Sequence, residues 1–203
     1  MKPIIILASA STRRSQILSQ CGIPHQIVAS GIKEIMDSQK GPAYNTVFNA
    51  CLKAETVSKQ FKTGYVIGVD TIVLSGKRLI GKPRTKREAK NLLKEFSGKN
   101  IFVYTGICIK DVRKQKTVKS FVASKIRVKK IKNKMLNRFL KLSGPFDKAG
   151  GFSIEGVGAF IFDDIEGSFY NILGLPIIKL NELFERLGVN FLEYCDSKLT
   201  ACN

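Results

Sequence analysis

The chain has 203 residues, with 34 lysines and arginines against 16 aspartates and glutamates, which gives a formal net charge of +18. Its hydrophobic fraction of 44% can fill one sizeable core, so we expect a single domain over residues 1–203, either compact or divided into two lobes around a cleft. No apolar run approaches the roughly 20 residues of a membrane span, and the segment 1–7 is too short for a signal peptide, so we expect a cytoplasmic protein with no membrane partner.

The first half of the chain alternates apolar strands with amphipathic helices. Val, Ile and Leu runs predict strands, and apolar residues at helical spacing predict helices. Glycines at 22 and 64 mark where the two helices stop. The predicted elements are a strand at 4–8, a helix at 13–20, a short strand at 25–29, a helix at 44–61, a strand at 65–74 and a tight turn into a strand at 78–80.

The second half contains hairpin signals as well as helices. Thr85 and Glu88 have the spacing of a helix capping box. The predicted elements are a helix at 85–96, paired antiparallel strands at 101–111 and 116–128, a basic helix at 132–142, a glycine-rich loop at 149–158, a strand at 159–162 and a helix at 175–187. Strand–helix alternation followed by hairpins predicts an α/β fold with a mixed, strongly twisted central sheet flanked by helices.

Small hydroxyl residues join the first strand to the first helix, in the segment ASASTRR at 8–14. Backbone N–H groups and the helix dipole make such a helix start attractive to anions. Guanidinium groups make paired contacts with phosphate oxygens. We therefore expect a phosphate site at Ser9, Ser11, Arg13 and Arg14. The alternative is a capped helix with two solvated arginines.

Asp70 stands alone in the apolar strand sequence VIGVDTIV at 66–73. A carboxylate there is costly unless it is paired or bound to a metal. A buried aspartate can bind Mg²⁺ or act as a general base. The alternative is an aspartate at a strand kink that satisfies the local backbone.

Three further charges lie at the edges of predicted elements: Glu34, Lys53 and Lys82. Taken singly, each is typical of a surface residue. Pro83 favours an extended backbone at Lys82 and could direct its ammonium group. The glycines at 149–158 permit close approach of a ligand, but the spacing matches neither a dinucleotide fingerprint nor a phosphate loop.

The remaining composition argues against several other functions. The five cysteines include no CxxC pair and His25 is the only histidine, which argues against a disulfide framework, a zinc site or a Ser-His-Asp enzyme. The densest basic run, 125–134, alternates with Ile and Val and contains no aromatic residue. We therefore expect a solvated basic surface around a site for a small polyanion rather than a nucleic-acid partner. A non-enzymatic basic regulatory or nucleic-acid-binding protein is the alternative function.

Five segments in order resemble the Maf family of nucleoside triphosphate pyrophosphatases, namely 7–14, 68–73, 81–84, 147–156 and 167–176. The resemblance extends over about residues 3–187. It implies a fold like that of inosine triphosphate pyrophosphatase, elongated with a central cleft and often assembled as a homodimer. It also implies hydrolysis of a nucleoside triphosphate to the monophosphate and pyrophosphate, with Mg²⁺ or Mn²⁺ as the divalent metal cofactor.

The resemblance also implies roles for ten residues. The catalytic set is Asp70, Lys82, Lys53 and Glu34, with Asp70 and Glu34 as metal ligands. The substrate-binding set is Ser9, Ser11, Arg13, Arg14, Thr71 and Glu155, of which Arg13, Thr71 and Glu155 fall at positions linked to base selection.

The sequence departs from the family pattern at several positions. Thr12 stands where proline is usual, and Leu52 where glutamate is common. Thr71 after Asp70 matches the branch that acts on dTTP and UTP, whereas Glu155 is more like the branch that acts on 7-methyl-GTP. An ionised glutamate only accepts hydrogen bonds, while the glutamine usual in the first branch also donates. The nucleobase therefore stays open at this point, as does a rival reaction that cleaves the γ-phosphate.

Overall fold

A mixed seven-stranded sheet forms the centre of the protein in the computed structural model, which describes residues 2–142 and 148–196. Its order is β2-β1-β3-β5-β6-β7, with β4 paired to the far end of β3. β1 runs parallel to β2 and β3, and the other pairs are antiparallel. This sheet confirms the predicted fold class. The strands are β1 (Ile5–Leu7), β2 (Gln26–Ile27), β3 (Tyr65–Ser75), β4 (Arg78–Ile80), β5 (Asn100–Asp111), β6 (Lys116–Val128) and β7 (Phe162–Glu166).

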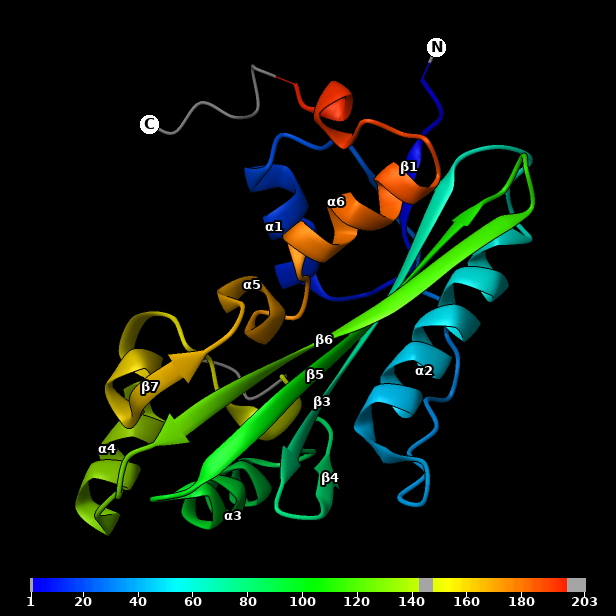
Figure 1. Ribbon diagram of the computed structural model, residues 1–203. Coiled ribbons are helices and arrows are strands. Elements are labelled where there is room, and N and C mark those ends of the chain that lie inside the picture. Colours follow the sequence, from blue (N-terminus) through cyan, green and yellow to red (C-terminus); the bar gives the residue numbers. More distant parts are fainter. Residues whose placement is uncertain (1, 143–147, 197–203) are drawn as a thin grey trace.

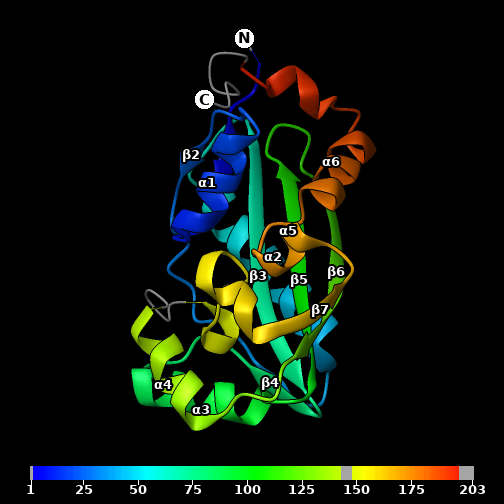
Figure 2. The ribbon, with the colours of Figure 1, turned by 90° about the vertical axis from the view of Figure 1, so that its left-hand side faces the viewer.

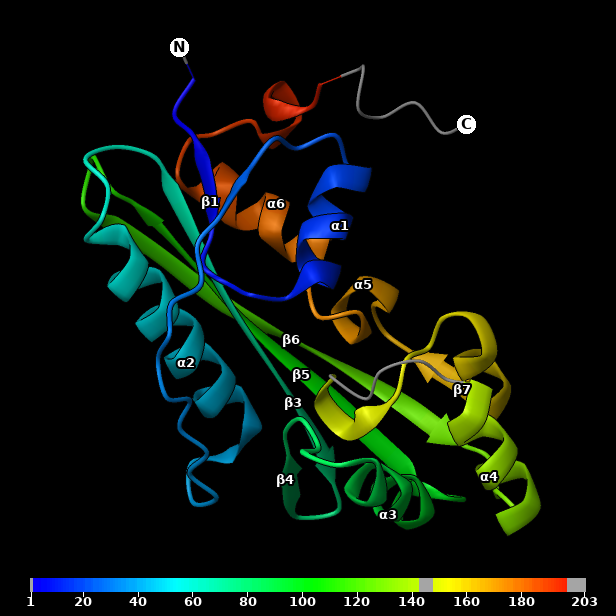
Figure 3. The ribbon, with the colours of Figure 1, turned by 180° about the vertical axis from the view of Figure 1, so that it is seen from behind.

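Helices cover both faces of the sheet. Helix α2 lies along one face, while α1, α5 and α6 lie on the other (Figure 1, Figure 3). Helices α3 and α4 lie together at one end of the long strands (Figure 2). Among the described helices, none is both long and apolar enough to cross a bilayer. The helices are α1 (Thr12–Gln20), α2 (Gly41–Ser58), α3 (Lys86–Phe96), α4 (Asn133–Leu142), α5 (Phe169–Ile172) and α6 (Ile177–Arg186), with short 3₁₀ turns η1 (Ala149–Gly151), η2 (Gly156–Ile161) and η3 (Phe191–Tyr194).

Three hydrophobic clusters stabilise this arrangement. One packs α1 and α6 against the sheet and includes Val69 and Ile107. A second packs α3 and α4 against the same face at the other end and includes Val73 and Val103. The third lies under α2 on the opposite face. The face of β3 and β5 opposite α2 therefore carries two separate cores, with a seam between them.

Two glycines allow α2 to lie unusually close to the sheet. A Cβ added at Gly68 would be 1.9 Å from the backbone oxygen of Ala50, and one at Gly106 would be 2.3 Å from the backbone carbonyl carbon of Thr46. A larger residue at either position would therefore push the helix away. Gly106 is also the register partner of Asp70, so this close packing occurs directly beside the candidate carboxylate.

Most predicted elements are present, but their ends differ: the helix expected at 44–61 with its stop at Gly64 is α2, Gly41–Ser58. The expected strand at 159–162 is wrong, because residues 156–161 form a 3₁₀ turn and the strand begins at Phe162. The short helix α5, capped by the Ser168 side chain, was not predicted. Asp147, at the start of the fourth resembling segment, lies outside the described residues.

Candidate active site

A cleft opens where the edge of β3 lacks a neighbouring strand. β1 pairs with residues 65–67 and β4 with residues 73–75, so in the described parts of the chain no strand covers residues 68–72 on that edge. The cleft has a volume of about 1220 Å³. It brings together nine of the ten predicted site residues, namely Ser9, Ser11, Arg13, Arg14, Glu34, Lys53, Asp70, Thr71 and Lys82. The tenth, Glu155, pairs with Arg13 beside it.

Asp70 is buried on the α2 side of the sheet, with 3% of its surface exposed. Its Oδ1 accepts a hydrogen bond from Lys53 Nζ at 2.7 Å, and its Oδ2 accepts one from Asn49 Nδ2 at 3.0 Å. The strand is regular through Asp70, so the strand-kink alternative does not apply. Asn49 was not singled out in the sequence, although it precedes Lys53 by one helical turn and so shares its face of α2.

Lys53 joins two carboxylates. Its ammonium group lies 2.6 Å from Glu34 Oε1 and 2.7 Å from Asp70 Oδ1, and it also donates to the Val69 carbonyl at 3.1 Å. Burial of the Glu34 carboxyl favours its neutral form, but the charge and hydrogen bond of Lys53 outweigh this, so that the pKa of Glu34 lies below its usual value. Glu34 therefore stays ionised.

The two carboxylates are a suitable donor set for a hard divalent cation. Carboxylate oxygens are preferred ligands of Mg²⁺, which keeps several waters and is usually shared with substrate phosphates. Within residues 2–142 and 148–196 no cluster of three or more Asp, Glu, His or Cys side chains occurs that could hold a metal by itself. Glu34 and Asp70, which both contact the Lys53 ammonium group, would hold such a cation only together with water and a triphosphate, and the Mg²⁺ or Mn²⁺ requirement stays a prediction.

Arg14 holds three segments together at the cleft wall. Its Nε donates to the Gly174 carbonyl at 2.8 Å, and its Nη1 donates to Ser9 Oγ at 2.9 Å and to the Val69 carbonyl at 3.0 Å. Its Nη2 donates to Thr71 Oγ1 at 3.0 Å. Burial lowers the pKa of Arg14, and the charges of nearby acids oppose this effect. Since a guanidinium has five N–H donors, one remains, so the expected two-point contact with phosphate is not available to Arg14.

The other cations of the cleft differ in how they are engaged. Arg13 forms an ion pair with Glu155, which joins the start of α1 to the turn before η2. Lys82 is exposed, and its ammonium group makes no hydrogen bond or ion pair with the described residues. The Ser11 backbone N–H bonds Ser9 Oγ at 3.3 Å, and the Ser11 side chain caps no helix. The ammonium group of Lys82 is therefore available to meet an incoming anion.

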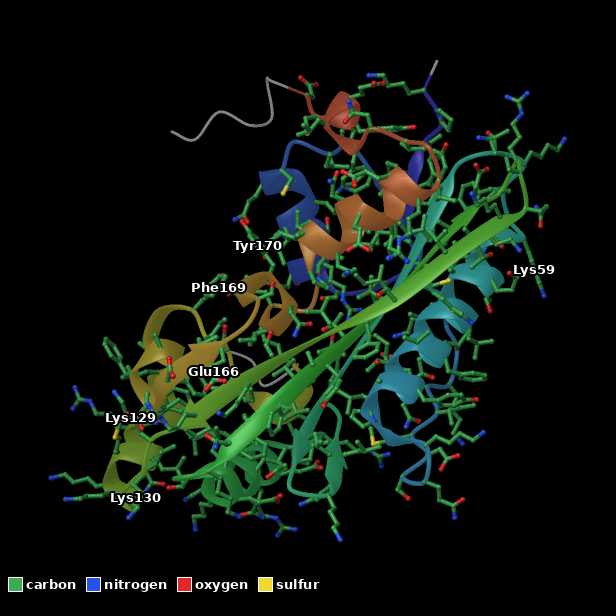
Figure 4. The ribbon with its side chains drawn as sticks, viewed as in Figure 1. Lys59, Lys129, Lys130, Glu166, Phe169 and Tyr170 are labelled. Carbon is green, nitrogen blue, oxygen red and sulfur yellow. The ribbon has the colours of Figure 1, made fainter. Side chains whose placement is uncertain are left out.

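Positive charge is also distributed far from the cleft. Lys59 follows the end of α2, whereas Lys129 and Lys130 lie at the other end of the molecule beside α4 (Figure 4). The basic side chains therefore extend over both ends of the elongated fold. This distribution agrees with the expected solvated basic surface.

A buried carboxylate among several cations, at the interrupted edge of a mixed α/β sheet, is an arrangement suited to hydrolysis of phosphoric anhydrides. The sequence profile described as Maf-like protein matches residues 4–187, and the chain belongs to this family. This match confirms the resemblance found in the five segments.

Similar proteins are named dTTP/UTP pyrophosphatase. The one from Dictyoglomus thermophilum is 34% identical over 193 residues, which cover 95% of this chain and 100% of the relative. The one from Caldicellulosiruptor saccharolyticus is 37% identical over 193 residues, covering 93% and 97% of the two chains. The one from Methanococcoides burtonii is 32% identical over 192 residues, covering 94% and 98%.

Proposed function

We propose that this protein hydrolyses nucleoside triphosphates of the dTTP and UTP class to the monophosphate and pyrophosphate. The observation that carries the proposal is the chain of contacts from Asp70 through Lys53 to Glu34, in the same cleft as Lys82 and the start of α1. The names of the similar proteins support the same reaction and the same nucleotides.

In the proposed reaction, water attacks the α-phosphorus, a new P–O bond forms, and the bond to the pyrophosphate oxygen breaks. Asp70 orients the water and accepts its proton, while Lys53 and Asn49 hold the carboxylate in place. Lys82 neutralises charge on the departing pyrophosphate, since phosphoryl transfer depends mainly on positioning and electrostatics. A divalent cation held by Glu34 and Asp70 would supply further neutralisation of the triphosphate.

The cleft also has an apolar side, which suits a nucleobase of either class. Val73, Phe152 and Ile154 are among its lining residues and offer a surface for a flat base. The Glu155 carboxylate, which by itself suggests the 7-methyl-GTP branch, is engaged by Arg13. An acceptor already used in an ion pair is less able to select a base, so the Thr71 position carries more weight.

Product analysis tests this proposal. The purified protein is incubated with a panel of ordinary and modified nucleoside triphosphates and Mg²⁺ or Mn²⁺, and pyrophosphate and inorganic phosphate are measured separately. Pyrophosphate with UTP and dTTP is the expected result. Release of inorganic phosphate in place of pyrophosphate would reject the reaction. Absence of hydrolysis together with steeply salt-dependent DNA binding would favour the non-enzymatic alternative.

Three expectations from the sequence stay predictions beside this proposal: the divalent metal, the homodimer and the cytoplasmic location. Each has a direct test, namely chelation of the metal, the molar mass in solution, and the position of a tagged protein in the cell.

A further inference from the structure

Two threonines face each other in the seam between the two cores. Thr71 of β3 is the register partner of Thr105 of β5, and their Oγ1 atoms are 3.0 Å apart. Thr71 lines the cleft, whereas Thr105 is fully buried. Two hydroxyl groups therefore stand where the packing on either side is apolar.

The direction of the hydrogen bond between the two threonines follows from their other partners, the Asn171 carbonyl and Arg14. A carbonyl oxygen only accepts, so the Thr105 hydroxyl donates its single proton to the Asn171 carbonyl at 3.1 Å. Thr105 must then accept from Thr71, whose own proton is thereby used. Arg14 Nη2 donates to Thr71 Oγ1 at 3.0 Å and occupies one of its two lone pairs. The hydroxyl of Thr71 retains one lone pair and no proton for a ligand.

Asn171, the last acceptor in this series of hydrogen bonds, is held rigidly. Asn171 is fully buried, and its Nδ2 donates to the Val103 carbonyl and to Ser124 Oγ, both at 2.9 Å. Its backbone N–H is bound by Ser168 Oγ, which caps α5. The Asn171 carbonyl therefore keeps its place, and it fixes the orientation of the two hydroxyls.

We infer that Thr105 is a positioning residue that restricts Thr71 to accepting hydrogen bonds from the cleft, so that the site selects a base with a ring N–H. This inference rests on the proposed pyrophosphatase function. Uracil and thymine carry a proton on N3, whereas cytosine presents a lone pair there. Because Thr71 can only accept a hydrogen bond, a base that turns a lone pair toward it is repelled. The site therefore discriminates against cytosine.

Thr105→Val is the direct test, because valine has the same shape and lacks the hydroxyl. The Asn171 carbonyl still receives a hydrogen bond from Gly174 N–H at 2.9 Å, so the variant is expected to fold. The Thr71 proton then loses its acceptor and can turn toward the cleft, where it would donate to N3 of cytosine. The ratio of kcat/KM for UTP over that for CTP, measured by pyrophosphate release, should fall by about threefold to tenfold. Thr105→Ser restores the hydroxyl and should restore the ratio.

A merely structural role for Thr105 would lower both kcat/KM values together or lower the melting temperature, and an unchanged UTP:CTP ratio in Thr105→Val would overturn the inference. The wild-type enzyme gives a second test that does not depend on a variant. It should prefer UTP to CTP and should hydrolyse N3-methyluridine triphosphate poorly, and equal rates would also overturn the inference. If the wild type released no pyrophosphate from any nucleotide, the proposed function itself would fail, which is a different outcome from an unselective pyrophosphatase.

Discussion

Lys53→Met removes the ammonium group that holds the candidate carboxylates while keeping most of the side-chain volume. Lys53 and Asp70 are both buried, with 8% and 5% of their side chains exposed. Breaking a buried ion pair by removing one partner costs about 3 kcal/mol or more, because the other charge is left uncompensated. The Glu34 side chain is 52% exposed, so the loss of its contact adds little. We expect a loss of about 3 kcal/mol in the free energy of unfolding, or a fall of roughly 6–12 °C in Tm.

Urea unfolding of the wild type and of Lys53→Met measures this loss, and Lys110→Met is the matched control. Lys110 is equally buried, but its partner Glu55 has 51% of its side chain exposed, so its replacement should cost less than about 1 kcal/mol. A double-mutant cycle of Lys53→Met with Asp70→Asn should give a coupling energy of about 2 kcal/mol. If Lys53→Met unfolded at the same urea concentration as the wild type, the electrostatic account of this site would be refuted.

Three other predictions concern the cleft and its supports. Gly106→Ala should destabilise the protein by about 2 kcal/mol or more in chemical denaturation and lower turnover, because the new Cβ meets the backbone of α2. In the control Gly76→Ala the new Cβ enters open space, so the cost should be only about 1 kcal/mol. Lys82→Ala should reduce kcat/KM at least tenfold with an unchanged Tm, since its ammonium group bonds no described residue; an unaltered kcat/KM would remove it from substrate binding. The pKa of Glu34 is lower in the folded protein than in the unfolded chain, so its contribution to stability is present above the unfolded pKa and is lost as pH falls through the folded pKa. The unfolding free energies of the wild type and Glu34→Gln should therefore differ by less than about 1 kcal/mol at pH 7, since Glu34 is half exposed, and converge in acid. A gap that does not change with pH would contradict this.

The fold was predictable where hydrophobic periodicity is strong. The apolar run of β3 and the alternation in β5 and β6 define long strands, and α3 has both a capping threonine and an amphipathic face. The region from η1 to β7 could not be predicted in the same way. Its glycines adopt conformations that no apolar pattern marks, and the polar strand Phe162–Glu166 is defined by its pairing with β6 rather than by its own sequence.

The site residues that stand out chemically in the sequence could be predicted. Those whose partners are brought close only by strand pairing and folding could not. Asp70 is conspicuous in an apolar strand, and Arg13 and Arg14 at a helix start. The hydrogen bonds of Arg14 could not be predicted, because its acceptors on Val69 and Gly174 are backbone carbonyls that only folding brings together. Thr105 likewise gains its place from the pairing of β5 with β3, which no local sequence signal specifies.

The central claim is that Asp70 acts on water at the α-phosphorus. The most direct measurement compares the wild type with Asp70→Asn, using UTP and Mg²⁺ or Mn²⁺ in ¹⁸O-labelled water, followed by mass analysis of UMP and pyrophosphate. The account predicts label in UMP alone for the wild type, and loss of most turnover by a folded Asp70→Asn protein. Label in pyrophosphate, or near-normal pyrophosphate release by Asp70→Asn, would contradict it.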